Sequence, residues 1–172
     1  MNNIVLVGFM AVGKTTVGKY LKDNLGYSLF DVDAIIEQEE NMKIKDIFAI
    51  KGEKFFREKE REIAKGLLNN DNNIISAGGG LFIDNEIRKI AIKNNFVVFL
   101  DLDIDEVYKR IQRNDKRPLA KEKSKKELQE LYISRLPFYK EATIRVDATG
   151  KNSRIVADEI VKLYIKWLNK EI

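Results

Sequence analysis

Residues 3–15 read NIVLVGFMAVGKT, and this stretch decides the fold class. It opens with a run of apolar, mostly β-branched residues that ends at Gly8, which is typical of a strand buried on both faces of a parallel sheet. Apolar residues then recur with helical spacing over residues 16–25, and Gly26 is a helix stop signal. The chain therefore begins with a predicted strand, a turn bounded by glycines and a predicted helix.

The same alternation of short apolar runs and amphipathic stretches continues along the chain. It predicts an α/β fold in which a five-stranded parallel sheet is flanked by helices on both faces. In such sheets, ligands bind beyond the carboxyl ends of the strands. The further strands are expected at 27–30, 73–77, 96–100 and 143–146, and the further helices at 33–65 with breaks near Asn41 and Gly52, at 84–93 capped by Asp84, at 105–112, at 126–138 and at 153–169.

The length of 172 residues predicts a single domain that spans residues 1–172. Residues 33–65 are expected to form a helical excursion from the sheet. Residues 113–124, RNDKRPLAKEKS, are highly charged and contain Pro118, so they predict a mobile surface loop.

The absence of cysteine and histidine removes whole classes of chemistry. The chain can have no disulfide, no thiolate nucleophile and no imidazole base. Any proton acceptor must then be a carboxylate, a lysine, a tyrosine or water. Any bound metal is expected to be a hard, oxygen-ligated ion, with Mg²⁺ as the natural candidate.

The charged residues are spread along the whole chain, with 31 Lys and Arg against 27 Asp and Glu and a net charge of +4. Because no dense basic tract or basic aromatic surface is present, we expect no nucleic-acid partner, and the mild basicity suits anionic small-molecule substrates. There is no long apolar stretch and no leader at Met1, so we expect no membrane association and a cytoplasmic location. A monomer is expected, since no interface patch is evident.

Residues 8–15, GFMAVGKT, match the P-loop pattern G-x-x-x-x-G-K-[ST] in full, between a predicted strand and a predicted helix. In this pattern, backbone N–H groups surround phosphate and the helix N-terminus adds partial positive charge. Lys14 is expected to reach the β- and γ-phosphates, and the Thr15 hydroxyl to ligate Mg²⁺. The motif predicts a P-loop NTPase-type fold, with an ATP site that includes Ala11, Val12, Gly13, Lys14, Thr15 and Thr16.

Two carboxylates, Asp31 and Asp33, bracket the end of the second predicted strand. Helix capping would account for Asp33. A nucleotide site without histidine, however, needs one carboxylate to orient Mg²⁺ and another to accept a proton from an attacking hydroxyl. Both carboxylates would serve at this location, and Asp31 is the expected metal ligand beside Thr15.

Residues 73–82, NIISAGGGLF, place three consecutive glycines at the end of another predicted strand. Glycine costs backbone entropy, so a run of it is expected where the chain turns sharply or where something approaches the backbone closely. Taken alone, the run is equally compatible with an ordinary loop.

The chain resembles the shikimate kinases, small members of the P-loop kinases, along essentially its whole length. Each shared motif is modest, but the ordered set is highly specific. The motifs are GFMAVGKTT at 8–16, the Asp31 and Asp33 pair, FREKE at 56–60, the triple glycine at 78–80, Arg117-Pro118-Leu119, and Arg135 followed by Tyr139.

The resemblance implies transfer of the γ-phosphoryl group of ATP to the 3-hydroxyl of shikimate, a step toward chorismate and the aromatic amino acids, with Mg²⁺ as cofactor. It implies that Asp33 binds the attacking hydroxyl and acts as its base. Arg57 and Arg135 would hold the carboxylate, and Glu60 would position Arg57. Residues 33–65 would form the substrate-binding excursion, and Gly78, Gly79 and Gly80 would present backbone N–H groups to the ring and its hydroxyls.

On the nucleotide side, the resemblance implies that Arg117 is a catalytic residue of a lid over 113–124, which folds over the ATP phosphates. Arg110 would stack on adenine, and Lys151 would begin the segment 151–153 that completes the adenine pocket. Without the resemblance, Arg117 is most simply a solvated loop charge, and Arg57 with Glu60 an exposed salt bridge.

Two other functions fit parts of this pattern. One is another small-molecule kinase of the same fold, such as a gluconate or nucleoside-monophosphate kinase, although the triple glycine and the two arginines argue against it. The other is a non-catalytic ATP-binding module, for which Asp33 and Arg117 would have no use.

Overall fold

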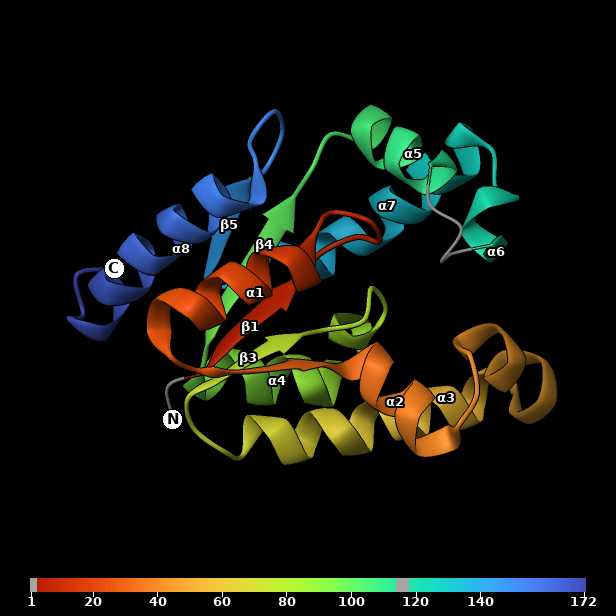
Figure 1. Ribbon diagram of the computed structural model, residues 1–172, viewed down its shortest axis with the longest axis horizontal. Coiled ribbons are helices and arrows are strands. Elements are labelled where there is room, and N and C mark those ends of the chain that lie inside the picture. The colour runs from red at the N-terminus through yellow and green to blue at the C-terminus, as the bar shows by residue number, and fades with distance from the viewer. Residues whose placement is uncertain (1–2, 114–117) are drawn as a thin grey trace.

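The computed structural model describes residues 3–113 and 118–172 and shows a five-stranded sheet in which every pairing is parallel (Figure 1). The strand order is β2-β3-β1-β4-β5, so β1 lies at the centre, between β3 and β4. The predicted α/β fold is confirmed. The strands are β1 (Ile4–Val7), β2 (Ser28–Asp31), β3 (Asn73–Ser76), β4 (Phe96–Asp101) and β5 (Ile144–Asp147).

Helices connect successive strands and cover both faces of the sheet (Figure 1). Helix α1 packs against α8 on one face, whereas α4 and the end of α7 contact the other face. The helices are α1 (Lys14–Leu25), α2 (Val32–Glu40), α3 (Ile44–Leu68), the 3₁₀ helix η1 (Leu81–Ile83), α4 (Asn85–Asn94), α5 (Ile104–Gln112), α6 (Pro118–Lys121), α7 (Lys125–Tyr139) and α8 (Ser153–Leu168).

Strand β4 shows why the apolar runs in this sequence are continuous rather than alternating. All six of its residues are buried. Phe96 packs against Tyr164 and Trp167 of α8, while Phe99, which points to the opposite face, stacks on Tyr139 of α7 with ring centroids 5.3 Å apart. Because helices bury both faces of the strand, side chains on both faces must be apolar.

The central position of β1 decides where ligands can bind. β1 pairs with β3 on one side and with β4 on the other, and the chain passes from β3 to β4 across β1. A crevice opens beyond the carboxyl ends of the strands where the direction of winding changes, which is the usual ligand site of an open parallel sheet. Both glycine-containing turns, after β1 and after β3, lie at this edge.

Several helix boundaries follow the predicted signals. Gly26 adopts a left-handed conformation (φ 70°) after α1, and Asn41 does so (φ 49°) after α2. Gly52 interrupts α3 with non-helical dihedral angles. The Asp84 side chain accepts hydrogen bonds from the first turn of α4, as predicted. Helix α1, however, begins at Lys14, two residues before the predicted start.

The expectation that residues 113–124 form only a loop is wrong in part. Residues 118–121 form the short helix α6. Ser124 then caps α7, since its side chain accepts from the Glu127 N–H while the Glu127 carboxylate accepts from the Ser124 N–H. The S-x-x-E spacing of this capping box is a sequence signature of a helix N-terminus. Residues 114–117 lie outside the described residues.

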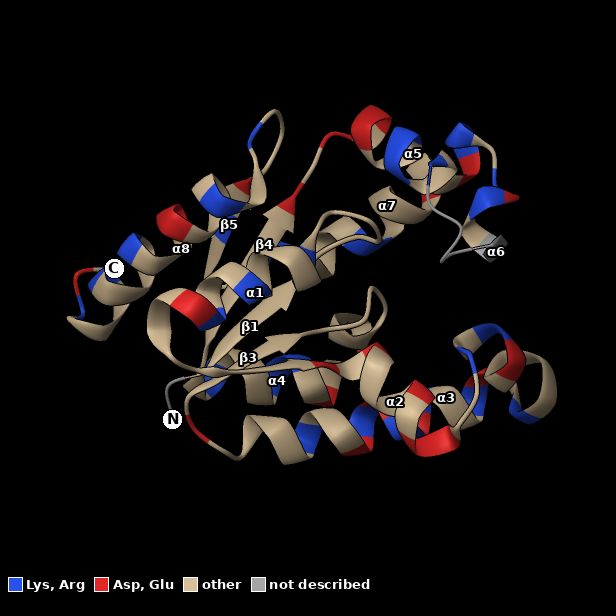
Figure 2. Cartoon of the chain, viewed as in Figure 1, with Lys and Arg blue, Asp and Glu red and all other residues tan. Residues whose placement is uncertain are grey.

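Charged side chains lie mainly on helices and loops, with only acidic ones on α2 and both signs interleaved along α3, whereas the strands are uncharged over most of their length (Figure 2). Within the residues that the structure describes, no helix is both long enough and apolar enough to cross a membrane.

Candidate active site

The turn between β1 and α1 depends on two glycines for its backbone conformation. Gly8 (φ 143°) and Gly13 (φ 100°) both have positive φ angles. A Cβ on Gly8 would also collide with the carbonyl oxygen of Leu100 in β4. Since only glycine combines this conformation with so close an approach, the two glycines of the motif set the shape of the loop.

Lys14 lies across this loop and is almost completely buried, with 6% of its surface exposed. Its Nζ donates hydrogen bonds to the carbonyl oxygens of Gly8 (3.0 Å) and Phe9 (2.8 Å). The ammonium group therefore lies inside the curve of the loop, next to the N-terminus of α1. Helix N-termini and lysine ammonium groups both favour phosphate, so this is an anion-binding geometry.

Thr15 and Asp31 meet at the ends of α1 and β2. The Thr15 hydroxyl donates to the Asp31 carboxylate at 2.5 Å. Asp31 also caps α2 by accepting from the Ala34 N–H at 3.3 Å, so the capping that the sequence suggested for Asp33 belongs to Asp31. A hydroxyl and a carboxylate in contact are the hard oxygen ligands that Mg²⁺ takes in phosphate sites, so this pair fits that ion.

The three glycines after β3 lie where side chains from two helices converge. A Cβ on Gly78 would meet the Glu60 carboxylate of α3 and would lie 2.6 Å from a carboxylate oxygen of Asp33 in α2. A Cβ on Gly80 would lie 2.6 Å from Nη1 of Arg57 in α3. A side chain at Gly78 or Gly80 would collide with these charged groups, which explains why glycine occupies both positions.

The middle glycine connects this cluster to the phosphate-binding loop. A Cβ on Gly79 would lie 3.3 Å from Nη1 of Arg135 in α7 and 3.7 Å from the backbone nitrogen of Met10. The two glycine-containing turns therefore lie next to each other at the edge of the sheet, and Arg135 lies beside both. We call the group of Asp33, Arg57, Glu60, residues 78–80 and Arg135 the acceptor cluster.

Glu60 is the most deeply buried charged group of the acceptor cluster, with 2% of its surface exposed. It pairs with Arg57, one helical turn earlier, at 2.6 Å. Burial raises the pKa of Glu60 to about 7, and the attraction of Arg57 opposes this rise without cancelling it. The pair is thus not the exposed salt bridge that composition alone suggests; only Glu53, the second partner of Arg57, is largely exposed.

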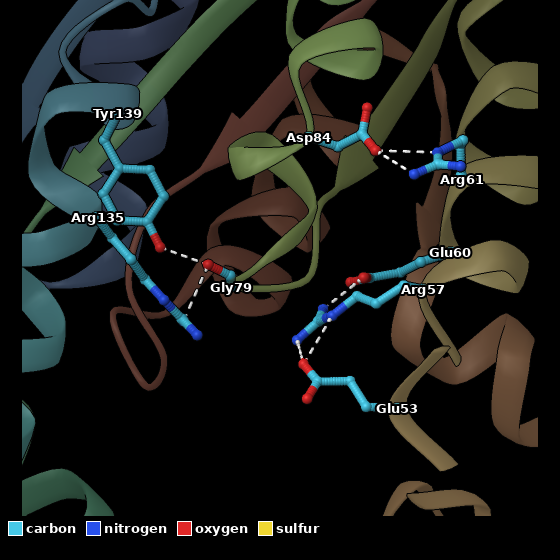
Figure 3. A network of polar contacts seen from close by, with 8 residues as sticks. All are labelled: Glu53, Arg57, Glu60, Arg61, Gly79, Asp84, Arg135 and Tyr139. Carbon is cyan, nitrogen blue, oxygen red and sulfur yellow. Dashed lines mark hydrogen bonds and ion pairs between the residues drawn. The ribbon is translucent and has the colours of Figure 1, made fainter. Parts of the chain in front are cut away.

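Arg135 and Tyr139 approach the glycine turn from α7, opposite α3 (Figure 3). Both donate to the carbonyl oxygen of Gly79, Arg135 through Nη1 at 3.1 Å and Tyr139 through its hydroxyl at 2.5 Å. The Arg135 guanidinium also lies over the Phe9 ring of the phosphate-binding loop, 5.8 Å from its centroid. Two arginines from separate helices thus face one turn.

A second ion pair holds α3 against the segment that follows the glycine turn (Figure 3). Arg61 donates two hydrogen bonds to one oxygen of Asp84, at 2.6 and 2.9 Å, while the other oxygen of Asp84 caps α4. Sequence reasoning found the cap but missed the arginine, because the two residues are 23 positions apart and no local pattern links them.

The residues predicted to surround adenine lie on the other side of the phosphate-binding loop. Arg110 of α5 donates to the carbonyl oxygens of Ala11 and Val12, each at 3.4 Å, and pairs with Glu106. Lys151 pairs with Glu159 at 2.8 Å. Arg117, the predicted catalytic residue of the lid, lies outside the described residues.

A phosphate-binding loop that touches a cluster of carboxylates and arginines defines a class of protein. The loop serves a nucleotide, and the arginine forks suit a small anionic acceptor, which together indicate a P-loop kinase for a small molecule. A family model described as shikimate kinase matches residues 10–165, and the chain belongs to that family.

Known relatives agree with this assignment. The chain is 43% identical to a shikimate kinase of Persephonella marina over 94% of this chain and 98% of the relative. The solved structure of a shikimate kinase from Acinetobacter baumannii in complex with shikimate has a TM-score of 0.89 and 31% identity, covering 95% of this chain and 93% of that one. A gluconokinase from Sinorhizobium meliloti shares only the fold, with a TM-score of 0.61 at 16% identity over 99% and 98% of the two chains.

Proposed function

We propose that this protein transfers the γ-phosphoryl group of ATP to the 3-hydroxyl of shikimate and releases shikimate 3-phosphate and ADP. The observation that carries this proposal is the close approach of the two glycine-containing turns, because it brings a phosphate site and the acceptor cluster to one edge of the sheet. A kinase needs its two substrates held end to end in this way, since positioning supplies much of the rate enhancement.

On the nucleotide side, we propose that residues 11–16 bind the phosphates through backbone N–H groups at the start of α1. Lys14 is already inside the loop and would place its positive charge against the transferring group. Charge that develops on phosphate oxygens is stabilised most by donors that are fixed in advance. Thr15 and Asp31 would hold Mg²⁺, which when bound neutralises charge on the phosphate oxygens.

On the acceptor side, Asp33 would orient the attacking hydroxyl and accept its proton. Asp33 lies at the Gly78 end of the turn. Arg57 and Arg135 reach the turn from α3 and α7 and would hold the shikimate carboxylate with two guanidinium forks. Glycine at 78–80 keeps space for the ring between these groups.

Three roles extend this proposal to the adenine and lid regions. Arg110 would stack on adenine, and its position against the carbonyl groups of the phosphate-binding loop supports that role. Lys151 would border the adenine pocket. Arg117 would close over the phosphates and exclude water from the reaction. We further propose that the protein acts as a monomer in the cytoplasm.

The test is a coupled assay of ADP release with purified protein, Mg²⁺ and ATP. Shikimate, gluconate and nucleoside monophosphates are each added to a separate reaction. Of these acceptors, only shikimate is expected to give ADP release. Phosphorus NMR of the product identifies the esterified hydroxyl. ADP release only with a nucleotide or gluconate acceptor would overturn the proposal, and ATP binding without turnover on any acceptor would favour a non-catalytic module.

A further inference from the structure

The carbonyl oxygen of Gly79 is held by two donors that lie one turn apart on α7. The Tyr139 hydroxyl donates to it at 2.5 Å and Arg135 Nη1 at 3.1 Å (Figure 3). Residues four positions apart share one face of a helix, so both side chains reach the same point. A backbone carbonyl within a glycine run is thus tied to a rigid element on the far side of the site.

Tyr139 is the more rigid of the two donors. Its side chain is fully buried, and its ring stacks on Phe99 of β4 at an interplanar angle of 27°. Burial raises the pKa of the Tyr139 phenol above its ordinary value, against an opposing effect of Arg135. The hydroxyl therefore stays protonated and able to donate throughout the neutral range.

Fixing the Gly79 carbonyl also fixes the N–H of Gly80. The two groups belong to one planar trans peptide unit, in which C=O and N–H point in opposite directions. Since the carbonyl points toward α7, the Gly80 N–H points away from α7, on the side where Gly80 faces Arg57. Among the described residues, no hydrogen bond reaches this N–H.

A glycine run needs such a restraint more than other sequences do. Glycine residues populate many backbone conformations, so the 79–80 peptide could rotate and turn its N–H out of the site. Arg135 shares this restraint through Nη1, but in the proposed function its guanidinium also binds the acceptor carboxylate, so Tyr139 is the donor that serves the carbonyl alone. The Tyr139 hydroxyl donates to no other acceptor among the described residues.

We propose that Tyr139 is a positioning residue for the acceptor: by holding the Gly79 carbonyl it aims the Gly80 N–H away from α7, toward the Arg57 side of the acceptor cluster. The proposal rests on the proposed function, since the acceptor is taken to be shikimate. Tyr139 does not touch the substrate in this arrangement. It acts through one peptide group.

The experiment is Tyr139→Phe, which removes the hydroxyl and keeps the ring stacked on Phe99. The KM for shikimate is expected to rise about tenfold, the cost of one lost, oriented hydrogen bond, while the KM for ATP stays within about twofold. Tyr164→Phe is the matched control. Tyr164 is equally buried, and its hydroxyl pairs with Tyr27 on the far side of the sheet, so both KM values are expected to stay unchanged.

A rise in the KM for shikimate without a rise in the KM for ATP separates a positioning role from general destabilisation. General destabilisation would also raise the KM for ATP, or would appear in Tyr164→Phe. Melting temperatures of both variants are measured alongside. If wild-type protein releases no ADP with shikimate, the proposed function itself fails. If the wild type is active and Tyr139→Phe leaves the shikimate KM unchanged, or raises both KM values equally, the positioning role is overturned and the proposed function stands.

A second measurement does not depend on the variant folding. Hydrogen–deuterium exchange of the wild-type protein is followed on the peptide that contains residues 78–81. Exchange of one amide is expected to slow when shikimate is added and not when ADP alone is added. Unchanged exchange in this peptide at saturating shikimate would show that the Gly80 N–H does not face the acceptor, and the proposal would fail.

Discussion

The two halves of the site are built in different ways. The phosphate-binding part of the nucleotide half is one contiguous stretch, residues 8–16, with its lysine, its glycines and its helix N-terminus in sequence order. The acceptor cluster is assembled from α2, α3, the turn after β3 and α7, across about a hundred residues of chain. A contiguous site depends on local backbone geometry, whereas an assembled site depends on how helices pack.

This difference predicts how each half responds to change. A substitution in the phosphate-binding loop removes one group and leaves the acceptor cluster in place. A substitution in the acceptor cluster also alters its neighbours, because Glu60, Arg57 and the glycine turn support one another. Four substitutions test this contrast, in order of decreasing expected effect.

Lys14→Met is expected to lower kcat by about 10⁴-fold, because it removes a fixed positive charge from the transferring phosphoryl group. If the halves are independent, calorimetry will show shikimate binding within about threefold of the wild type. Lys19→Met, at an exposed position of the same helix, is the control and should be fully active. A large loss of shikimate binding in Lys14→Met would contradict the separation of the two halves.

Asp33→Asn is expected to lower kcat by about 10³-fold and to leave the KM for ATP nearly unchanged, since a neutral amide can still accept a hydrogen bond but cannot take the proton. Steady-state kinetics with each substrate varied in turn measures both constants. Asp23→Asn, on the exposed face of α1, is the control. Near-normal turnover in Asp33→Asn would remove Asp33 from the mechanism.

Glu60→Gln is expected to change how stability depends on pH. The pKa of Glu60 is about 7 in the folded protein and 4.5 ordinarily, so the folded state holds the proton more tightly and Glu60 costs stability as pH rises from about 4.5 to 7. Relative to the wild type, the free energy of unfolding of Glu60→Gln should therefore increase across this window, by up to about 3 kcal/mol.

Urea unfolding at several pH values measures this difference. Glu53→Gln is the matched control, because Glu53 pairs with the same arginine but is largely exposed. It should change the free energy of unfolding by less than about 0.5 kcal/mol at every pH. A Glu60→Gln difference that falls with rising pH would mean that attraction to Arg57 outweighs burial.

Gly80→Ala is expected to raise the KM for shikimate about tenfold, because the new methyl group would displace Arg57 from its place beside Glu60. The KM for ATP should not change. Gly66→Ala is the matched control: Gly66 lies on α3, and a methyl group there would meet no atom within 4 Å, so alanine should stabilise the helix by up to about 1 kcal/mol. Equal effects of the two substitutions would show that the turn tolerates a side chain.

Most elements of the fold could be predicted because their signals are local. The run before Gly8, the stop at Gly26 and the cap at Asp84 each depend on a few neighbouring residues, and each prediction is confirmed. The start of α7 was predicted at residue 126, one residue after its observed start at Lys125, without use of the local capping box that Ser124 and Glu127 form. The site was harder to predict, since the burial of Glu60 and the approach of Tyr139 depend on helices distant in sequence.

The sequence by itself determined the parallel α/β class, the phosphate-binding loop and the exclusion of thiol and imidazole chemistry, because these follow from periodicity, spacing and composition. Tertiary structure alone decided the strand order, the close approach of the two glycine-containing turns and the environment that brings the pKa of Glu60 to about 7. The physical reason is that hydrogen-bonded turns and helix ends involve residues close along the chain. Burial and the convergence of charges arise only when distant segments pack together.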